Sequence, residues 1–88
     1  MRLLPWSGPD GQPCYLSTDG SGGFLAQLAD DMEEVQVSTG EEVLERATEL
    51  LRGPAEPSAD ELRFCVHRLC EALRDALRIV ESRAGRAE

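Results

Sequence analysis

This chain of 88 residues lacks lysine, an even set of cysteines, long apolar runs and an abundance of aromatic side chains. Its three cysteines are odd in number and irregularly spaced, which argues against a disulfide framework. No charge-free stretch approaches the roughly 20 residues that a membrane-spanning helix needs. The first residues turn polar soon after Leu4, too early for the apolar core of a secretory signal. We therefore expect a cytoplasmic protein with reduced thiols and no membrane association.

The charge of the chain is acidic and unevenly distributed. All nine basic residues are arginine, and the net charge is −8. The imbalance lies within residues 19–49, which contain nine acids and only Arg46 as a base, whereas residues 1–18 and 50–88 are each neutral. An acidic segment repels phosphate backbones and attracts basic proteins. The sequence thus predicts a basic protein as partner and no nucleic-acid binding.

Residues 2–17 have the pattern of a β-hairpin. Gly8-Pro9-Asp10-Gly11 places proline and aspartate at the centre of a type I turn, followed by a glycine that can adopt a positive φ. This predicts a three-to-five-residue loop with a bulge. Pro5 and Pro13 lack a backbone donor, so we expect short, irregular strands. Pairing across the turn puts Leu4, Trp6, Cys14 and Leu16 on one face, and Leu3, Pro5 and Tyr15 on the other.

A first long helix is predicted over residues 24–52, after a glycine- and serine-rich linker at 18–23. Apolar residues recur there at spacings of three and four. The apolar face shifts by about a quarter turn near residues 38–40. The segment is therefore one kinked helix or two helices, and we favour the kinked helix. Its apolar positions are Leu25, Leu28, Met32 and Val35 in the first half, and Val43, Ala47 and Leu50 in the second.

A second helix is predicted over residues 58–84, after a loop at 53–57 that contains two prolines. Ser58 and Glu61 can form a capping box at its start. The apolar stripe of this helix is about 160° wide, more than one antiparallel partner helix covers. A second copy of the chain would cover the remainder by building a four-helix bundle. The stripe, which we expect to form a homodimer core, comprises Leu62, Val66, Leu69, Leu73, Ala76 and Val80, flanked by Cys65, Cys70, Ala72 and Leu77.

Catalytic and metal-binding signals are weak. Cys65 and Cys70 point about 140° apart on a helix, and neither stands four residues from His67, the spacing typical of zinc ligands on a helix. No nucleophile, base and acid stand at spacings that would assemble a catalytic site. We expect no enzymatic activity, no cofactor and no bound metal, and we expect Cys65 and Cys70 to be buried and slow to react. The alternative is a small-ligand, metal or redox sensor that uses these two cysteines and the bundle core.

Two surfaces are candidate sites for another protein. One is the acidic face of the first helix, represented by Glu41, Glu42 and Glu45. The other is Phe64, which points almost opposite to the apolar stripe. We expect the N-terminal hairpin to cover Phe64 with Trp6 or Leu16; otherwise Phe64 and Trp6 would anchor a partner. A basic strip on the second helix is expected to match the acids of the first, and it consists of Arg63, His67, Arg74 and Arg78.

The opening of the chain, Met1–Trp6 with Gly8–Gly11 and Pro13–Leu16, resembles short acidic proteins of unassigned function from high-GC actinobacteria. The resemblance implies an origin and a cytoplasmic location, and it supplies no activity or site residue. The sequence as a whole predicts a single, mainly α domain. A short β-hairpin precedes an antiparallel helical hairpin that dimerises. The predicted function is a non-enzymatic interaction module, such as a regulatory adaptor or accessory subunit.

Overall fold

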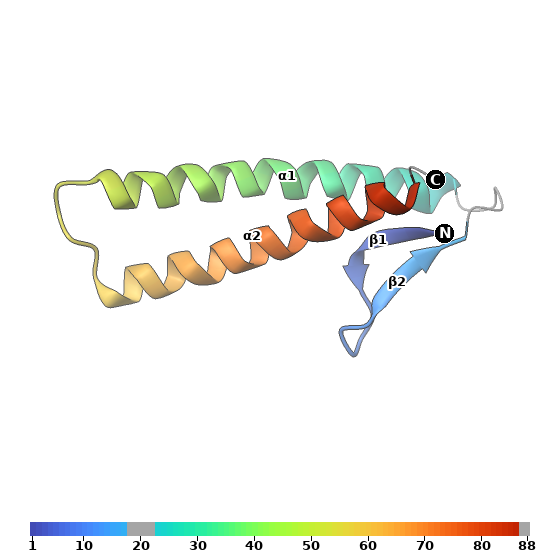
Figure 1. The fold of residues 1–88 in the computed structure, drawn as a ribbon, viewed down its shortest axis with the longest axis horizontal. Coiled ribbons are helices and arrows are strands. Elements are labelled where there is room, and N and C mark those ends of the chain that lie inside the picture. The colour runs from blue at the N-terminus through green and yellow to red at the C-terminus, as the bar shows by residue number, and fades with distance from the viewer. Residues whose placement is uncertain (18–22, 87–88) are drawn as a thin grey trace.

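The computed structural model describes residues 1–17 and 23–86 and confirms the predicted order of elements. A two-stranded antiparallel hairpin precedes two long helices that run antiparallel (Figure 1). The hairpin lies near the end of the helix pair where the second helix finishes, away from the loop that joins the helices (Figure 1). Most of the predicted linker at 18–23 lies outside the described residues. The elements are β1 (Arg2–Ser7), β2 (Pro13–Leu16), α1 (Gly23–Arg52) and α2 (Ala59–Arg86).

The hairpin turn forms as its residues predict. The Gly11 backbone N–H donates to the Gly8 carbonyl at 2.9 Å, and Gly11 has a φ of 79°, which glycine adopts without strain. The Gly8 N–H in turn donates to the Gln12 carbonyl at 2.8 Å. Leu3 pairs with Tyr15, and Ser7 with Pro13, with an irregularity between these two pairs. The strands are therefore short and irregular, as the two prolines required.

β1 is buried on both of its faces and is held by side chains of the helices. Leu3, Leu4 and Pro5 are all buried. The Ser82 hydroxyl donates to the Leu3 carbonyl at 2.9 Å, and the Gln36 amide donates to the Pro5 carbonyl at 2.9 Å. Arg78 donates to the same Pro5 oxygen at 3.1 Å. Side chains of α1 and α2 thus satisfy backbone acceptors that a two-stranded sheet leaves open.

The side chain of Arg2 fastens the start of β1 to α1. Its Nη2 atom lies 2.6 Å from Asp30 Oδ1 and 3.4 Å from Glu33 Oε2, and its Nη1 donates to the Ala26 carbonyl at 3.2 Å. The side chains of Arg2 and Glu33 are both more than nine-tenths buried, whereas that of Asp30 is 56% exposed. An ion pair with charge-assisted hydrogen bonds therefore sits inside the junction of hairpin and helix.

α1 is one helix without interruption through residues 38–40. Gly40 lies there against α2, and a Cβ placed on it would be 3.9 Å from the Ala72 Cβ. The small residues allow the two helices to approach closely at this point. Contact with α2 follows one line along α1, so Ala29 and Glu33 are buried, as are Val43 and Ala47. The first-half apolar face predicted from spacing is not buried: Leu25, Leu28, Met32 and Val35 are all exposed.

α2 begins at the predicted capping box. The Glu61 backbone N–H donates to Ser58 Oγ at 3.1 Å, and the Ser58 N–H donates to Glu61 Oε1 at 3.2 Å. The covered line of α2, however, stands one residue before the predicted stripe positions Val66, Leu69, Leu73, Ala76 and Val80. Ile79 and Ser82 are buried, and Cys65, Arg68, Ala72 and Asp75 are half-buried. One residue is about 100° around a helix, so the predicted stripe turns outward.

Candidate protein-binding surfaces

The predicted dimer stripe of α2 is an exposed apolar surface in the single chain. Leu73 is 61% exposed and Val80 is 64% exposed, and only Leu69 of the stripe residues is partly covered. The reason is the width of the apolar arc. Its Cys65, Ala72 and Ile79 side faces α1, and most of the remaining side is left uncovered by the described residues, although Leu77 borders a crevice beside the hairpin. The exposed members are Leu62, Val66, Leu73, Ala76, Leu77 and Val80.

An apolar groove of about 450 Å³ runs between this stripe and α1. Val37 and Leu44 form its α1 side, and Leu69 and Leu73 line the α2 side. Both α1 residues are exposed. Sequence reasoning missed this α1 edge because Val37 and Leu44 lie outside the two faces assigned to the helix. Their spacing of seven residues, which Leu51 continues, is the signal that would have found it.

The acidic face of α1 is solvent-exposed, as predicted. Glu41, Glu42 and Glu45 are all exposed, because α2 packs on the side of α1 that carries Val43 and Ala47. None of these three carboxylates makes an ion pair or hydrogen bond with another described side chain. The charges of this face are therefore uncompensated within the described parts of the chain.

The basic strip of α2 does not match the acids of α1, contrary to our expectation. Among the described side chains, none of Arg63, His67, Arg74 and Arg78 forms an ion pair with an acid of α1. Arg78 instead donates to the hairpin, and Arg74 borders a crevice beside Tyr15. The cause is again that α2 faces α1 with a side about 100° away from the predicted one. This orientation turns Arg63, His67 and Arg74 away from α1.

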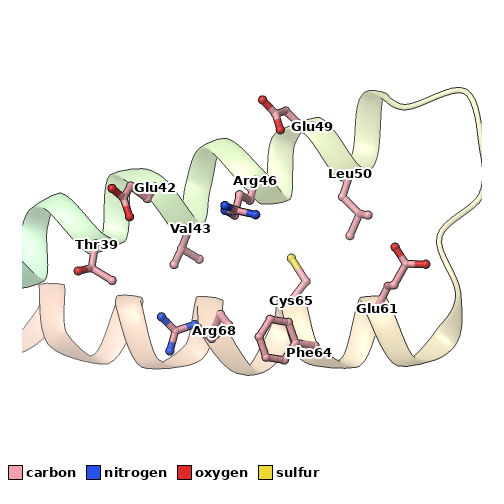
Figure 2. Close-up of a pocket in the computed structure, with 10 residues that line it drawn as sticks. All are labelled: Thr39, Glu42, Val43, Arg46, Glu49, Leu50, Glu61, Phe64, Cys65 and Arg68. Atoms are coloured by element: carbon pink, nitrogen blue, oxygen red, sulfur yellow. The ribbon is translucent and has the colours of Figure 1, made fainter.

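A second cleft, of about 720 Å³, opens between the helices near their connecting loop (Figure 2) and shares no lining residue with the apolar groove. Phe64 borders it and is 68% exposed. The expectation that Trp6 or Leu16 covers Phe64 is wrong, because β1 is anchored near Arg78 and Ser82, far along α2. Trp6 is half-buried in β1, which is bonded to Arg78 and Ser82, so the two proposed anchors do not form one site.

The cysteines differ from the prediction. Cys14, Cys65 and Cys70 are free thiols, but Cys70 is exposed and Cys65 is only half-buried. Cys65 Sγ points toward α1 in the second cleft (Figure 2). Over residues 1–17 and 23–86, no three His, Cys, Asp or Glu side chains are grouped so that they could hold a metal ion. The two cysteines of α2 therefore do not share a site in the single chain.

Comparisons of the chain with protein-family models, with curated proteins and with solved structures gave no match. Neither described helix has a segment long and apolar enough to cross a lipid bilayer. The candidate functional sites are therefore three surfaces of the chain itself. These are the acidic face of α1, the outward apolar stripe of α2 with its groove, and the cleft in Figure 2.

Proposed function

We propose that this chain is a non-enzymatic protein–protein interaction module of the cytoplasm, acting as a regulatory adaptor or accessory subunit for a basic protein. One observation carries the proposal. The side of α1 that faces away from α2 presents exposed acids that form no ion pair with a described side chain. Besides Glu41, Glu42 and Glu45, this face includes Glu34 and Glu49.

The electrostatic repulsion among these acids supports a role for them in binding. Like charges one turn apart on a helix repel one another, so the helix gains no stability from their density. A basic partner would remove that repulsion and would be steered to the face by its field. Exposed charges are screened beyond about 8 Å at physiological ionic strength. Binding through this face must therefore weaken steeply as salt is added.

Charge reversal tests the proposal. Glu42, Glu45 and Glu49 are replaced together by lysine, and Glu41 is kept because it borders the apolar groove. The matched control reverses Glu56, Glu71 and Glu81, which are exposed acids outside α1. The tagged wild type, used as bait in a native lysate, should retain a basic protein that salt displaces. The α1 variant should lose that protein, and the control variant should keep it.

Two results would contradict the acidic-face proposal. One is capture of the same protein by the α1 variant with unchanged salt tolerance. The other is equal loss of the captured protein from both variants, which would mean that binding depends on the total charge of the chain and not on this face. Circular dichroism of each variant confirms that the helices remain, since the replaced side chains are exposed.

The cleft in Figure 2 supports a second candidate, a sensor of small molecules. Val43, Leu50 and Phe64 supply apolar walls, and the guanidinium groups of Arg46 and Arg68 border them. This combination suits a molecule with an apolar body and a carboxylate. Decanoate at millimolar concentration should then raise the melting temperature of the wild type. The rise should be lost in Arg46→Ala; no rise in the wild type would end this candidate.

A further inference from the structure

The chain exposes more surface than a compact protein of its size. Its accessible area is 6725 Å² for a mass of 9.6 kDa. A typical monomer of that mass exposes about 5,100 Å², so the excess is about 1,600 Å². Each subunit of an obligate homodimer buries roughly 1,000–2,500 Å². The excess is therefore of the size that one dimer interface would bury.

The apolar part of the exposed surface is concentrated on one side of the helix pair. The groove lined by Val37, Leu44, Leu69 and Leu73 joins the edge of α1 to the outward stripe of α2. The stripe keeps a heptad spacing, with steps of four and three residues from Leu62 onward. Such a seam is complementary to another long helix. We call this surface, from Val37 and Leu44 across to the α2 stripe, the apolar face.

We propose that a second copy of this chain covers the apolar face, with the two-fold axis parallel to the helices. In this arrangement α1 of each subunit packs antiparallel on α2 of the other, and the four helices form a bundle. The proposal goes beyond the partner-binding function and does not depend on it. It assigns the apolar face to the dimer and leaves the outermost acids of α1 free for a different protein.

Charge selects this orientation over the alternative. The outer flank of the apolar face carries Glu34 and Glu41 along α1, and Arg63, Arg74 and Glu81 along α2. An axis parallel to the helices brings the acids of each α1 flank beside Arg74 of the other subunit. An axis perpendicular to the helices would stack α1 on α1 and oppose acid to acid. Like charges in a closed interface oppose association, so the second arrangement is disfavoured.

The register of the two helices supports the pairing. Gly40 and Ala72 lie at the same height along the molecule, since a Cβ on Gly40 would touch Ala72. A two-fold axis parallel to the helices keeps each residue of the second subunit at the same height along the bundle as its counterpart in the first. Arg74 of one subunit then falls at the level between Glu34 and Glu41 of the other. Opposite charges therefore meet at this level, near the middle of the bundle.

The first test compares two exposed apolar residues on different sides of α2. Leu73 is on the apolar face and Phe64 borders the other cleft. Sedimentation equilibrium at about 50 μM should give twice the 9.6 kDa chain mass for the wild type and for Phe64→Glu. Leu73→Glu should give the mass of one chain, because it buries a charge in the seam. A monomeric wild type would overturn the proposal, and so would a Leu73→Glu variant that remains a dimer.

The second test changes charged residues at the rim of the proposed interface, so it leaves the apolar core of the bundle intact. Glu41→Arg and Arg74→Glu should each weaken the dimer about tenfold, because each change creates two repulsive contacts across the two-fold axis. The double variant Glu41→Arg/Arg74→Glu restores both pairs and should recover most of the lost affinity. Additive weakening in the double variant would overturn the orientation, whether or not Leu73→Glu folds.

Discussion

Replacement of Arg2 by methionine tests the junction between the hairpin and α1. The methionine keeps most of the apolar length of the side chain and removes its charge and donors. The variant loses the contact with Asp30 at 2.6 Å and the hydrogen bond to the Ala26 carbonyl. It also loses the contact at 3.4 Å with the Glu33 carboxylate, which is 7% exposed. We expect the hairpin to loosen from the helices.

The size of the effect follows from the burial of the two partners. Removal of one member of a buried ion pair costs about 3–5 kcal/mol, because the other charge stays in a low-dielectric site. Asp30 is largely exposed and recovers its hydration, so the lower end of that range applies here. A loss of about 3 kcal/mol is a large part of the 5–15 kcal/mol that stabilises a typical domain.

Urea unfolding followed by circular dichroism measures this loss at one fixed protein concentration. Arg46→Met is the matched control, since Arg46 is exposed, lies away from the apolar face and has no ion pair with a described residue. It should change stability by less than about 0.5 kcal/mol. Adding Glu33→Gln to Arg2→Met should recover about 1–3 kcal/mol if the two residues are coupled. Equal stability of Arg2→Met and Arg46→Met would refute the reasoning.

Two further changes have expected outcomes in the same assay. Ser82→Ala removes the donor to the buried Leu3 carbonyl, so stability should fall by about 1–3 kcal/mol; a change below 0.5 kcal/mol would mean that water replaces the hydroxyl. Ser58→Ala breaks the capping box of α2 and should cost about 1 kcal/mol, whereas Ser58→Asp should preserve most of the stability. Equal losses in both Ser58 variants would show that the cap does not stabilise the helix.

Local features of the fold could be predicted because neighbouring residues determine them. The turn at Gly8–Gly11 needs a positive φ where a glycine stands, and the cap at Ser58 needs a glutamate three residues later. The exposed acids of α1 are equally local, because residues such as Glu45 stand opposite the α2-facing positions Val43 and Ala47. Each of these features follows from a few consecutive side chains.

The rotation of α2 could not be predicted, because three elements compete for one wide apolar arc. Leu73 and Ile79 are equally suited to a core by hydropathy, yet only Ile79 is buried. The choice is made by contacts distant in sequence, among them the close approach of Ala72 to Gly40 and the hydrogen bond from Ser82 to β1. Periodicity gives the width of an apolar arc and not the part of it that a given neighbour covers.

The distance between the loops of two associated chains tests the proposed bundle most directly. A single nitroxide label is placed at Ala55, in the loop between α1 and α2, in a chain whose three cysteines are replaced by alanine. Pulsed electron spin resonance then measures the separation of the two labels. With the axis parallel to the helices both loops lie at one end of the bundle, and the separation should be roughly 10–25 Å, given about 8–10 Å between packed helices. A separation near 40 Å, about the length of α1 at 1.5 Å per residue, would place the loops at opposite ends and contradict the account, as would the absence of any dipolar coupling.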